Sequence, residues 1–177
     1  MKGYFAKTAG FSLIELLVVI TIVSLLTGMI VSSVSGSKGK ARDAQRVSDL
    51  GHLQLALALY LDRCGSYPSS PLNVATANGC PSGTTLGSYI SQIPVPPSGA
   101  GQASYDYAIL NNGSSVYVSY VLHADLEANN PAVLRGLNAA SIPQPGGSYS
   151  WSPSTTAAPY TTCSNATNSV DYCVTPN

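Results

Sequence analysis

The first pattern along the chain is a long apolar segment close to the amino terminus. Between Phe11 and Val34 nearly every side chain is apolar or small, and Glu15 is the one charged residue. A helix of this length, at about 1.5 Å per residue, would cross the roughly 30 Å hydrocarbon core of a bilayer. A charge inside such a segment costs on the order of 2.5–3.5 kcal/mol at mid-depth. We therefore expect the carboxylate of Glu15 to find its partner in another protein molecule.

A second apolar pattern follows at the period of an α-helix. From Lys38 to Asp62 apolar residues recur at steps of three and four, and no proline interrupts them. This spacing predicts an amphipathic helix that continues the apolar segment and ends near Cys64 and Gly65, with Pro68 close behind. The predicted stripe consists of Ala44, Val47, Leu50, Leu53, Leu57 and Tyr60.

A polar row lies on another face of this predicted helix. Asp43, Arg46, Asp49 and His52 follow one another at three-residue steps. Opposite charges at this spacing stabilise a helix by a few tenths of a kcal/mol per pair. We expect the row to be exposed, and the apolar stripe to be covered by a sheet from the rest of the chain.

After residue 100 the pattern changes to a two-residue alternation. Ala103–Leu110 and Ser114–His123 alternate in this way, and Asn111-Asn112-Gly113 stands between them. This combination predicts a β-hairpin. Because two strands alone are marginally stable, we expect a third strand near Ser148–Trp151 or near Tyr172.

These patterns predict an α+β fold in which one long N-terminal helix, transmembrane and then amphipathic, packs on a small antiparallel sheet. We expect four segments along the chain. They are a leader peptide over 1–10, a transmembrane and assembly helix over 11–36, the amphipathic half of the same helix over 37–63, and a periplasmic or extracellular α+β head with disulfide loops over 64–177.

The composition and the missing motifs mainly exclude classes of function. Charged residues make up 9% of the chain and the formal net charge is zero, so no nucleic-acid partner is predicted. Neither a nucleophile elbow nor an HExxH motif occurs, and no catalytic residue or cofactor site is predicted. We interpret His123 as a surface residue at a strand end. The carboxylates of Asp125, Glu127 and Asp171 are too few to assign a calcium site, and no metal ligand is predicted.

Four cysteines follow the apolar segment: Cys64, Cys80, Cys163 and Cys173. None forms a CxxC pair, and their even number favours disulfides in an oxidising compartment over a zinc site. Three pairings are possible, and free thiols are an alternative. We favour the two local pairs, Cys64 with Cys80 and Cys163 with Cys173, each stabilising the fold by about 2–4 kcal/mol.

The start of the chain resembles a known family. Gly10 followed by Phe11-Ser12-Leu13-Ile14-Glu15 and an apolar segment resembles the class III leader of type IV pilins and type II secretion pseudopilins. Residues Ala41–Pro68 are similar to the second helical half of the major pseudopilins. The resemblance implies a ladle-shaped pilin fold, cleavage after Gly10 by the prepilin peptidase and N-methylation of Phe11. In a filament, Glu15 of one subunit would then pair with the new amine of its neighbour, since two buried opposite charges are tolerable together and costly apart.

The resemblance also implies a function. The chain would be a structural subunit of a type IV pilus-like filament, without enzymatic activity. Its partners would be further copies of itself, minor pilins, the prepilin peptidase, an assembly platform and an ATPase. It would wait in the cytoplasmic membrane as a single-pass protein with its leader in the cytoplasm, and then enter a cell-surface or periplasm-spanning filament. Two alternatives stay open: a type II secretion pseudopilin that drives protein export, and a membrane-anchored surface binding protein that does not polymerise.

Overall fold

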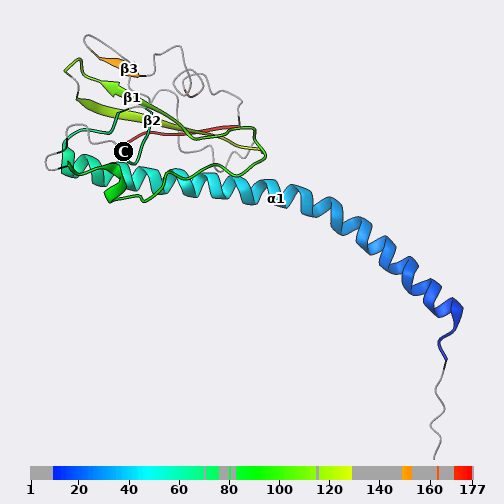
Figure 1. Ribbon diagram of the computed structural model, residues 1–177. Helices are drawn as coiled ribbons and strands as arrows, with labels where there is room; N and C mark the ends of the chain where they lie inside the picture. The colour runs from blue at the N-terminus through cyan, green and yellow to red at the C-terminus, as the bar shows by residue number, and fades with distance from the viewer. Residues whose placement is uncertain are drawn as a thin grey trace, which may run out of the picture. The chain divides into compact units, whose positions relative to one another are not determined.

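Figure 1 draws the structure, which is a computed structural model. Its chain divides into two compact units, residues 1–38 and 39–177. The residues that the structure describes are 10–69, 71–75, 80, 83–114, 116–128, 149–152, 163 and 170–176.

The amino-terminal unit is formed by the first part of helix α1, whose bounds are Leu13–Cys64. The carbonyl of Ser12 accepts hydrogen bonds from the backbone N–H groups of Glu15 and Leu16, which starts the helix. The hydroxyl groups of Thr21, Ser24 and Thr27 donate to carbonyls of the preceding turn, at 2.7–2.8 Å. Their polar atoms are therefore satisfied within the helix itself.

Large apolar side chains of this unit are exposed. Phe11 is 79% exposed, and Leu16 and Leu26 are 60% and 55% exposed. In the part of the chain that the structure describes, no helix is both long enough and apolar enough to cross a membrane. The transmembrane segment expected over 11–36 stays a prediction.

The carboxyl-terminal end of α1 lies in the second unit and stops where the sequence predicts. Helix α1 ends at Cys64, and Gly65 follows with a φ of 69°. The N–H of Gly65 donates to the carbonyl of Leu61 at 2.8 Å, which satisfies an orphan carbonyl of the last turn. Glycine adopts this left-handed backbone without the steric cost of a Cβ.

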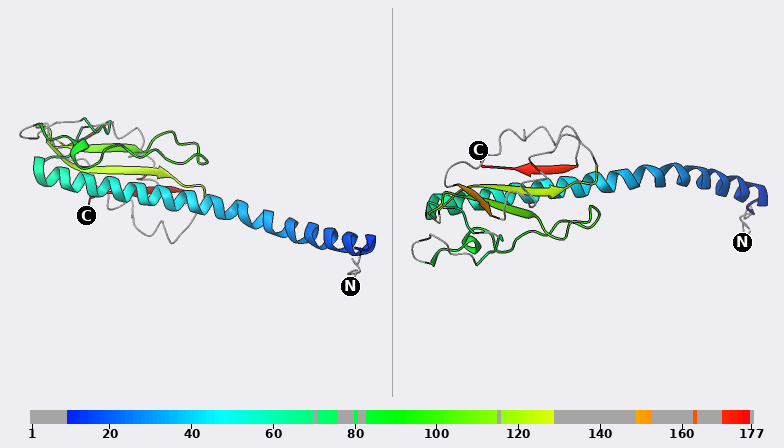
Figure 2. Two further views of the ribbon diagram at one scale, coloured as in Figure 1. Left: turned by 60° about the horizontal axis from the view of Figure 1, so that its bottom comes forward. Right: turned by 90° about the horizontal axis from the view of Figure 1, so that it is seen from above.

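An antiparallel sheet of four strands lies along this part of α1, in the order β3-β1-β2-β4 (Figure 2). The strands are β1 (Asp106–Asn111), β2 (Tyr117–Asp125), β3 (Ser150–Ser152) and β4 (Asp171–Val174). Strands β1 and β2 form the predicted hairpin, with Asp106 opposite His123. Both positions proposed for a third strand supply one, because β3 pairs with β1 and β4 pairs with β2.

The main core lies between the sheet and α1. Leu50, Leu53, Leu57 and Tyr60 of the predicted stripe meet the face of β1 and β2 that carries alternate tyrosines and aliphatic residues. The stripe was predicted wrongly at its amino-terminal end, where Ala44 is exposed and Val47 is only half-buried. A short 3-10 helix, η2 (Leu86–Ser88), adds the buried Leu86 to the same core. The opposite face of the sheet carries a second, smaller cluster of buried side chains: Ala108, Leu110, Val121, Trp151, Cys163 and Cys173. This is the predicted α+β arrangement of a pilin-like fold.

The prediction of an exposed polar row is wrong at three of its four positions. Asp43, Arg46 and Asp49 are 5%, 0% and 6% exposed, and only His52 lies at the surface. Each three-residue step turns back by about 60° around the helix, so such a row crosses the helix surface instead of following one face. Arg46 lies four residues before Leu50 and therefore shares the buried face.

Candidate functional site

The residues predicted to be processed lie at the start of the amino-terminal unit. Gly10 and Phe11 precede helix α1 and are exposed. No heavy atom of the described residues lies within 4 Å of the place that a Cβ on Gly10 would occupy. The packing of the described residues therefore tolerates a larger side chain at position 10. A need for glycine there would come from an enzyme that recognises the cleavage site.

Glu15 lies in the first turn of α1, where the helix dipole favours a negative charge. Its side chain is exposed among apolar neighbours. Within the described residues, no cationic side chain lies within ion-pair distance of its carboxylate.

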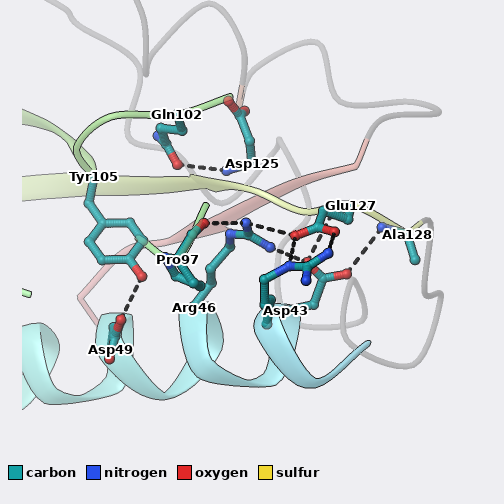
Figure 3. A network of polar contacts seen from close by, with 10 residues as sticks. Asp43, Arg46, Asp49, Pro97, Gln102, Tyr105, Asp125, Glu127 and Ala128 are labelled. Atoms are coloured by element: carbon teal, nitrogen blue, oxygen red, sulfur yellow. Dashed lines mark hydrogen bonds and ion pairs between the residues drawn. The ribbon is translucent and has the colours of Figure 1, made fainter. Parts of the chain in front are cut away.

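A network of buried charges marks the second unit, and its centre is Arg46 (Figure 3). The Nη1 group of Arg46 donates to Oδ1 of Asp43 at 2.6 Å. Its Nη2 group donates to the carbonyl of Pro97 at 2.7 Å and lies 3.0 Å from Oε1 of Glu127. The guanidinium thereby connects α1 to the segment before β1 and to the segment after β2.

Glu127 is held by a second arginine. The Nε group of Arg42 donates to Oε1 of Glu127 at 2.6 Å, and Nη2 of Arg42 donates to Oε2. The hydrogen bond from Arg42, with a smaller contribution from Arg46, lowers the pKa of Glu127 to about 2. Gly99 has a φ of 145°, and a Cβ there would overlap the carboxylate of Glu127. Only glycine fits this close approach of the two chain segments.

The remaining buried carboxylates of the helix also hold parts of the head. Asp43 accepts hydrogen bonds from the backbone N–H groups of Glu127 and Ala128 at 2.9 and 3.1 Å. The hydroxyl of Tyr105 donates to Oδ2 of Asp49 at 2.7 Å. Burial and the contact with Asp49 both raise the pKa of Tyr105. Asp43 and Arg46 therefore both hold the segment after β2, and Asp49 holds the segment before β1.

His123 is buried rather than exposed, and the interpretation of it as a surface residue is wrong. It is 3% exposed, and its Nδ1 lies 2.9 Å from Oδ2 of Asp106 on the neighbouring strand. Its Nε2 lies 3.2 Å from Oδ1 of Asp171 and 3.3 Å from Oδ1 of Asp125. Burial alone would lower the pKa of His123, but the hydrogen bonds with Asp106 and Asp171 outweigh burial and raise it.

Two disulfides close loops of the head. Cys64, the last residue of α1, is bonded to Cys80, and Cys163 is bonded to Cys173 of β4. The predicted Cys64–Cys80 pair is therefore confirmed. The first bond fixes the end of the helix to the segment before η2, and the second holds β4 from the face opposite α1.

The chain is similar to one family model and to several curated proteins. Residues 5–31 match the family model described as a prokaryotic N-terminal methylation motif. The type II secretion system core protein G of Pectobacterium carotovorum subsp. carotovorum is 33% identical over 118 residues, which cover 63% of this chain and 71% of that protein.

Two further relatives carry the same name. The core protein G of Escherichia coli strain K12 is 31% identical over 113 residues, covering 60% of this chain and 74% of that protein. The protein of Klebsiella pneumoniae is 33% identical over 113 residues, covering 60% of this chain and 77% of that protein. No solved structure matches the chain significantly. With this identity over most of each relative's length, the chain belongs to the family of type II secretion system core protein G, the major pseudopilins.

Proposed function

We propose that this chain is a major pseudopilin, the structural subunit of a filament that serves type II secretion. The observation that supports this proposal most is the family membership, together with the methylation motif over residues 5–31. The sequence alone favoured a type IV pilus subunit and kept a pseudopilin as the alternative. The comparisons favour that alternative, because the relatives are core proteins of the type II secretion system.

In this proposal the chain matures by cleavage after Gly10 and by N-methylation of Phe11. Exposure of both residues at the start of α1 supports this step, since a peptidase needs access to the bond that it cuts. Cleavage leaves a positive amine at the end of an apolar helix. That amine is the partner that Glu15 lacks among the described residues of its own subunit.

Assembly would bury the exposed apolar side chains of the amino-terminal unit. Each large aliphatic side chain that is fully buried contributes about 1.5–3 kcal/mol, and the segment from Phe11 to Leu26 exposes many of them. Before assembly the inner membrane would cover these side chains, and in the filament the same helix of neighbouring subunits would cover them. Pairing of Glu15 with the amine of a neighbour would then set the axial register.

The role of the second unit would be mechanical and not enzymatic. The network around Arg46 and the Cys64–Cys80 disulfide fix the head to α1 at several separate points. A head held in this way moves with its helix when the filament grows. Minor pseudopilins, an assembly platform and an ATPase would be further partners of the filament.

The experiment that tests this proposal is mass spectrometry of the mature protein, purified from cells that contain the prepilin peptidase. We expect a chain that starts at methylated Phe11. Replacement of Gly10 by valine should block processing, whereas Gly36→Ala, at an exposed helical glycine with open space around it, should not. A mature protein that still starts at Met1 would contradict the proposal.

A second measurement separates secretion from a surface pilus. Deletion of the gene should stop export of exoproteins to the medium, while electron microscopy of sheared cells should show no loss of surface pili. Normal export together with a loss of surface pili would instead support a type IV pilus subunit.

A further inference from the structure

The tip of the hairpin between β1 and β2 carries an Asn-X-Ser triplet, Asn112-Gly113-Ser114. We propose that Nδ2 of Asn112 is a site of N-linked glycosylation, with an oligosaccharide carried on a polyprenyl pyrophosphate as the co-substrate. Transferases that make this bond recognise asparagine followed two residues later by serine or threonine, in surface loops of exported proteins. The proposal does not depend on the filament function, because it concerns only the surface of the second unit. A second triplet of this kind, Asn165-Ala166-Thr167, lies outside the described residues.

The chain turns sharply at the first triplet. Gly113 has a φ of 82°, a left-handed backbone that glycine adopts without the steric cost of a Cβ. The N–H of Asn112 donates to the carbonyl of Val116 at 3.1 Å, which closes the hairpin. Gly113 and Ser114 lie beyond this bond and are exposed. An enzyme can therefore reach the triplet from the end of the sheet.

The side-chain amide of Asn112 is oriented by the loop itself. Its Oδ1 accepts hydrogen bonds from the backbone N–H groups of Ser114 at 2.9 Å and of Val116 at 3.3 Å. The first of these bonds closes an Asx turn. Because both partners are donors, the amide atom that faces them is the oxygen. Nδ2 lies on the other side of the planar amide and makes no hydrogen bond with another described residue.

This geometry suits the transfer of a sugar to Nδ2. In that step Nδ2 attacks C1 of the first sugar, and the bond between C1 and the pyrophosphate oxygen breaks, with its electron pair going to the pyrophosphate. One amide proton leaves to a carboxylate of the transferase, so atoms and charge balance. Hydrogen bonds to Oδ1 of Asn112 draw electron density to the oxygen and make these protons more acidic. The turn therefore favours loss of the proton as the new bond forms.

The surroundings of the tip supply an independent observation. Three large side chains with apolar surface are exposed there: Val116 by 37%, Val118 by 42% and Tyr149 by 46%. Tyr149 directly precedes β3, whose first residue is opposite Asn111 of β1. Exposed apolar surface favours unwanted association. A hydrophilic glycan on Asn112 would shield this surface from other subunits.

Asn73 provides a matched comparison within the same chain. Its Oδ1 accepts a hydrogen bond from the backbone N–H of Ala75 at 2.7 Å, which is the same Asx turn at an exposed position. The residue two positions after Asn73 is alanine, so the hydroxyl group that a transferase recognises is missing. Asn73 should therefore carry no sugar, and Ala75→Ser should create a second site there.

Mass spectrometry of the mature full chain, purified from its own cells and digested with chymotrypsin, tests the proposal. Electron-transfer fragmentation keeps a sugar on the residue that carries it and so locates the attachment. We expect a glycan on Asn112 and none on Asn73. Ser114→Ala should abolish the modification and leave the turn intact, because alanine retains the backbone N–H that bonds to Oδ1. Ser114→Thr, which keeps a hydroxyl group, should retain the modification.

Three outcomes would overturn the proposal. The first is an Asn112 without a sugar, whether as asparagine or as the aspartate that hydrolysis of its amide would leave. The second is a glycan on Asn112 that persists in Ser114→Ala. The third is a sugar on the hydroxyl of Ser114 in place of the amide. Methylation of Phe11 is read from the same sample, so a glycosylated chain that still starts at Met1 would contradict the filament proposal alone.

Discussion

Glu15 and Arg46 belong to the same helix, yet their charged side chains differ in exposure and in ion-pair partners. In the amino-terminal unit Glu15 is exposed and, among the described residues, has no ion-pair partner. In the second unit Arg46 is fully buried and pairs with Asp43 and Glu127. The charge of Arg46 is satisfied within its own unit, whereas in the proposed filament the charge of Glu15 would pair with a neighbouring subunit. Four predictions test this difference, from the largest expected effect to the smallest.

Replacement of Glu15 by leucine should nearly abolish assembly and leave the subunit fold unchanged. The carboxylate makes no ion pair with the described residues of its own subunit, so its loss removes only the contact with a neighbour. We expect the amount of filament, measured by cross-linking of sheared fractions, to fall by about a hundredfold, which corresponds to a loss of about 2.7 kcal/mol per contact. Thr21→Leu in the same segment is the control and should assemble normally. Normal assembly of the Glu15 variant would contradict the proposed ion pair.

Replacement of Arg46 by methionine should have the opposite effect and destabilise the head. Breaking a buried ion pair from one side leaves an uncompensated charge and costs about 3–5 kcal/mol. Asp43 would lose its arginine, while Glu127 would retain Arg42. Denaturant unfolding followed by tyrosine fluorescence measures the change. Arg63→Met, at an exposed position of the last helical turn, should change stability by less than about 0.5 kcal/mol, and an equal effect of both variants would contradict the network's role.

Alkaline pH should unfold the second unit and spare the first. Burial raises the pKa of Tyr120 to about 12 and that of Tyr107 well above its ordinary value. The folded chain then keeps these phenols neutral where the unfolded chain ionises them. This stability is fully present below about pH 10 and is lost as the pH rises through about 12.

The measurement is the midpoint of urea unfolding as a function of pH, with tyrosinate absorbance as a second probe. The described residues of the amino-terminal unit contain no tyrosine, so helix content from that unit should persist at high pH. A midpoint that stays constant up to pH 12 would show that the buried tyrosines ionise without unfolding.

Replacement of Tyr105 by phenylalanine should have the smallest effect. The variant loses one hydrogen bond to the buried carboxylate of Asp49, and hydrogen bonds to charged groups contribute about 1.5–3 kcal/mol. Gln45 still reaches Asp49 at 3.4 Å, which favours the lower end of this range. Thermal unfolding measures the loss, and Tyr149→Phe, at an exposed tyrosine, is the matched control. Equal melting temperatures for both variants would show that Asp49 is held by other groups.

Local patterns in the sequence predicted the parts of the fold that depend on neighbours along the chain. The helix end at Cys64 and the hairpin around Gly113 follow from turn residues and from two-residue or three- and four-residue spacing. Strands β3 and β4 were expected because a hairpin alone is marginally stable. The Cys64–Cys80 bond follows from the short separation of the two cysteines. These features need no knowledge of contacts between distant segments.

The buried charges were missed for two separate reasons. For Arg46 the signal was present, because Asp43, Arg46 and Leu50 continue the three- and four-residue spacing of the apolar stripe toward the amino terminus. Because the predicted stripe included only apolar residues, the burial of Asp43 and Arg46 was not predicted. For His123 no local signal existed, because its burial depends on β4, whose pairing with β2 joins segments far apart in the sequence. The spacing of residues along the chain does not predict contacts that arise from the pairing of distant strands.

The order of strands also bears on how the subunit avoids unwanted association. The two edges of the sheet are β3 and β4, which contain three and four residues. An edge this short offers few unpaired backbone groups to another sheet, and short edges are one way in which proteins avoid aggregation through strand addition. Subunits crowded together before assembly would thus be protected from joining through their heads. In the proposed filament, polymerisation would proceed only through the apolar surface of the helix.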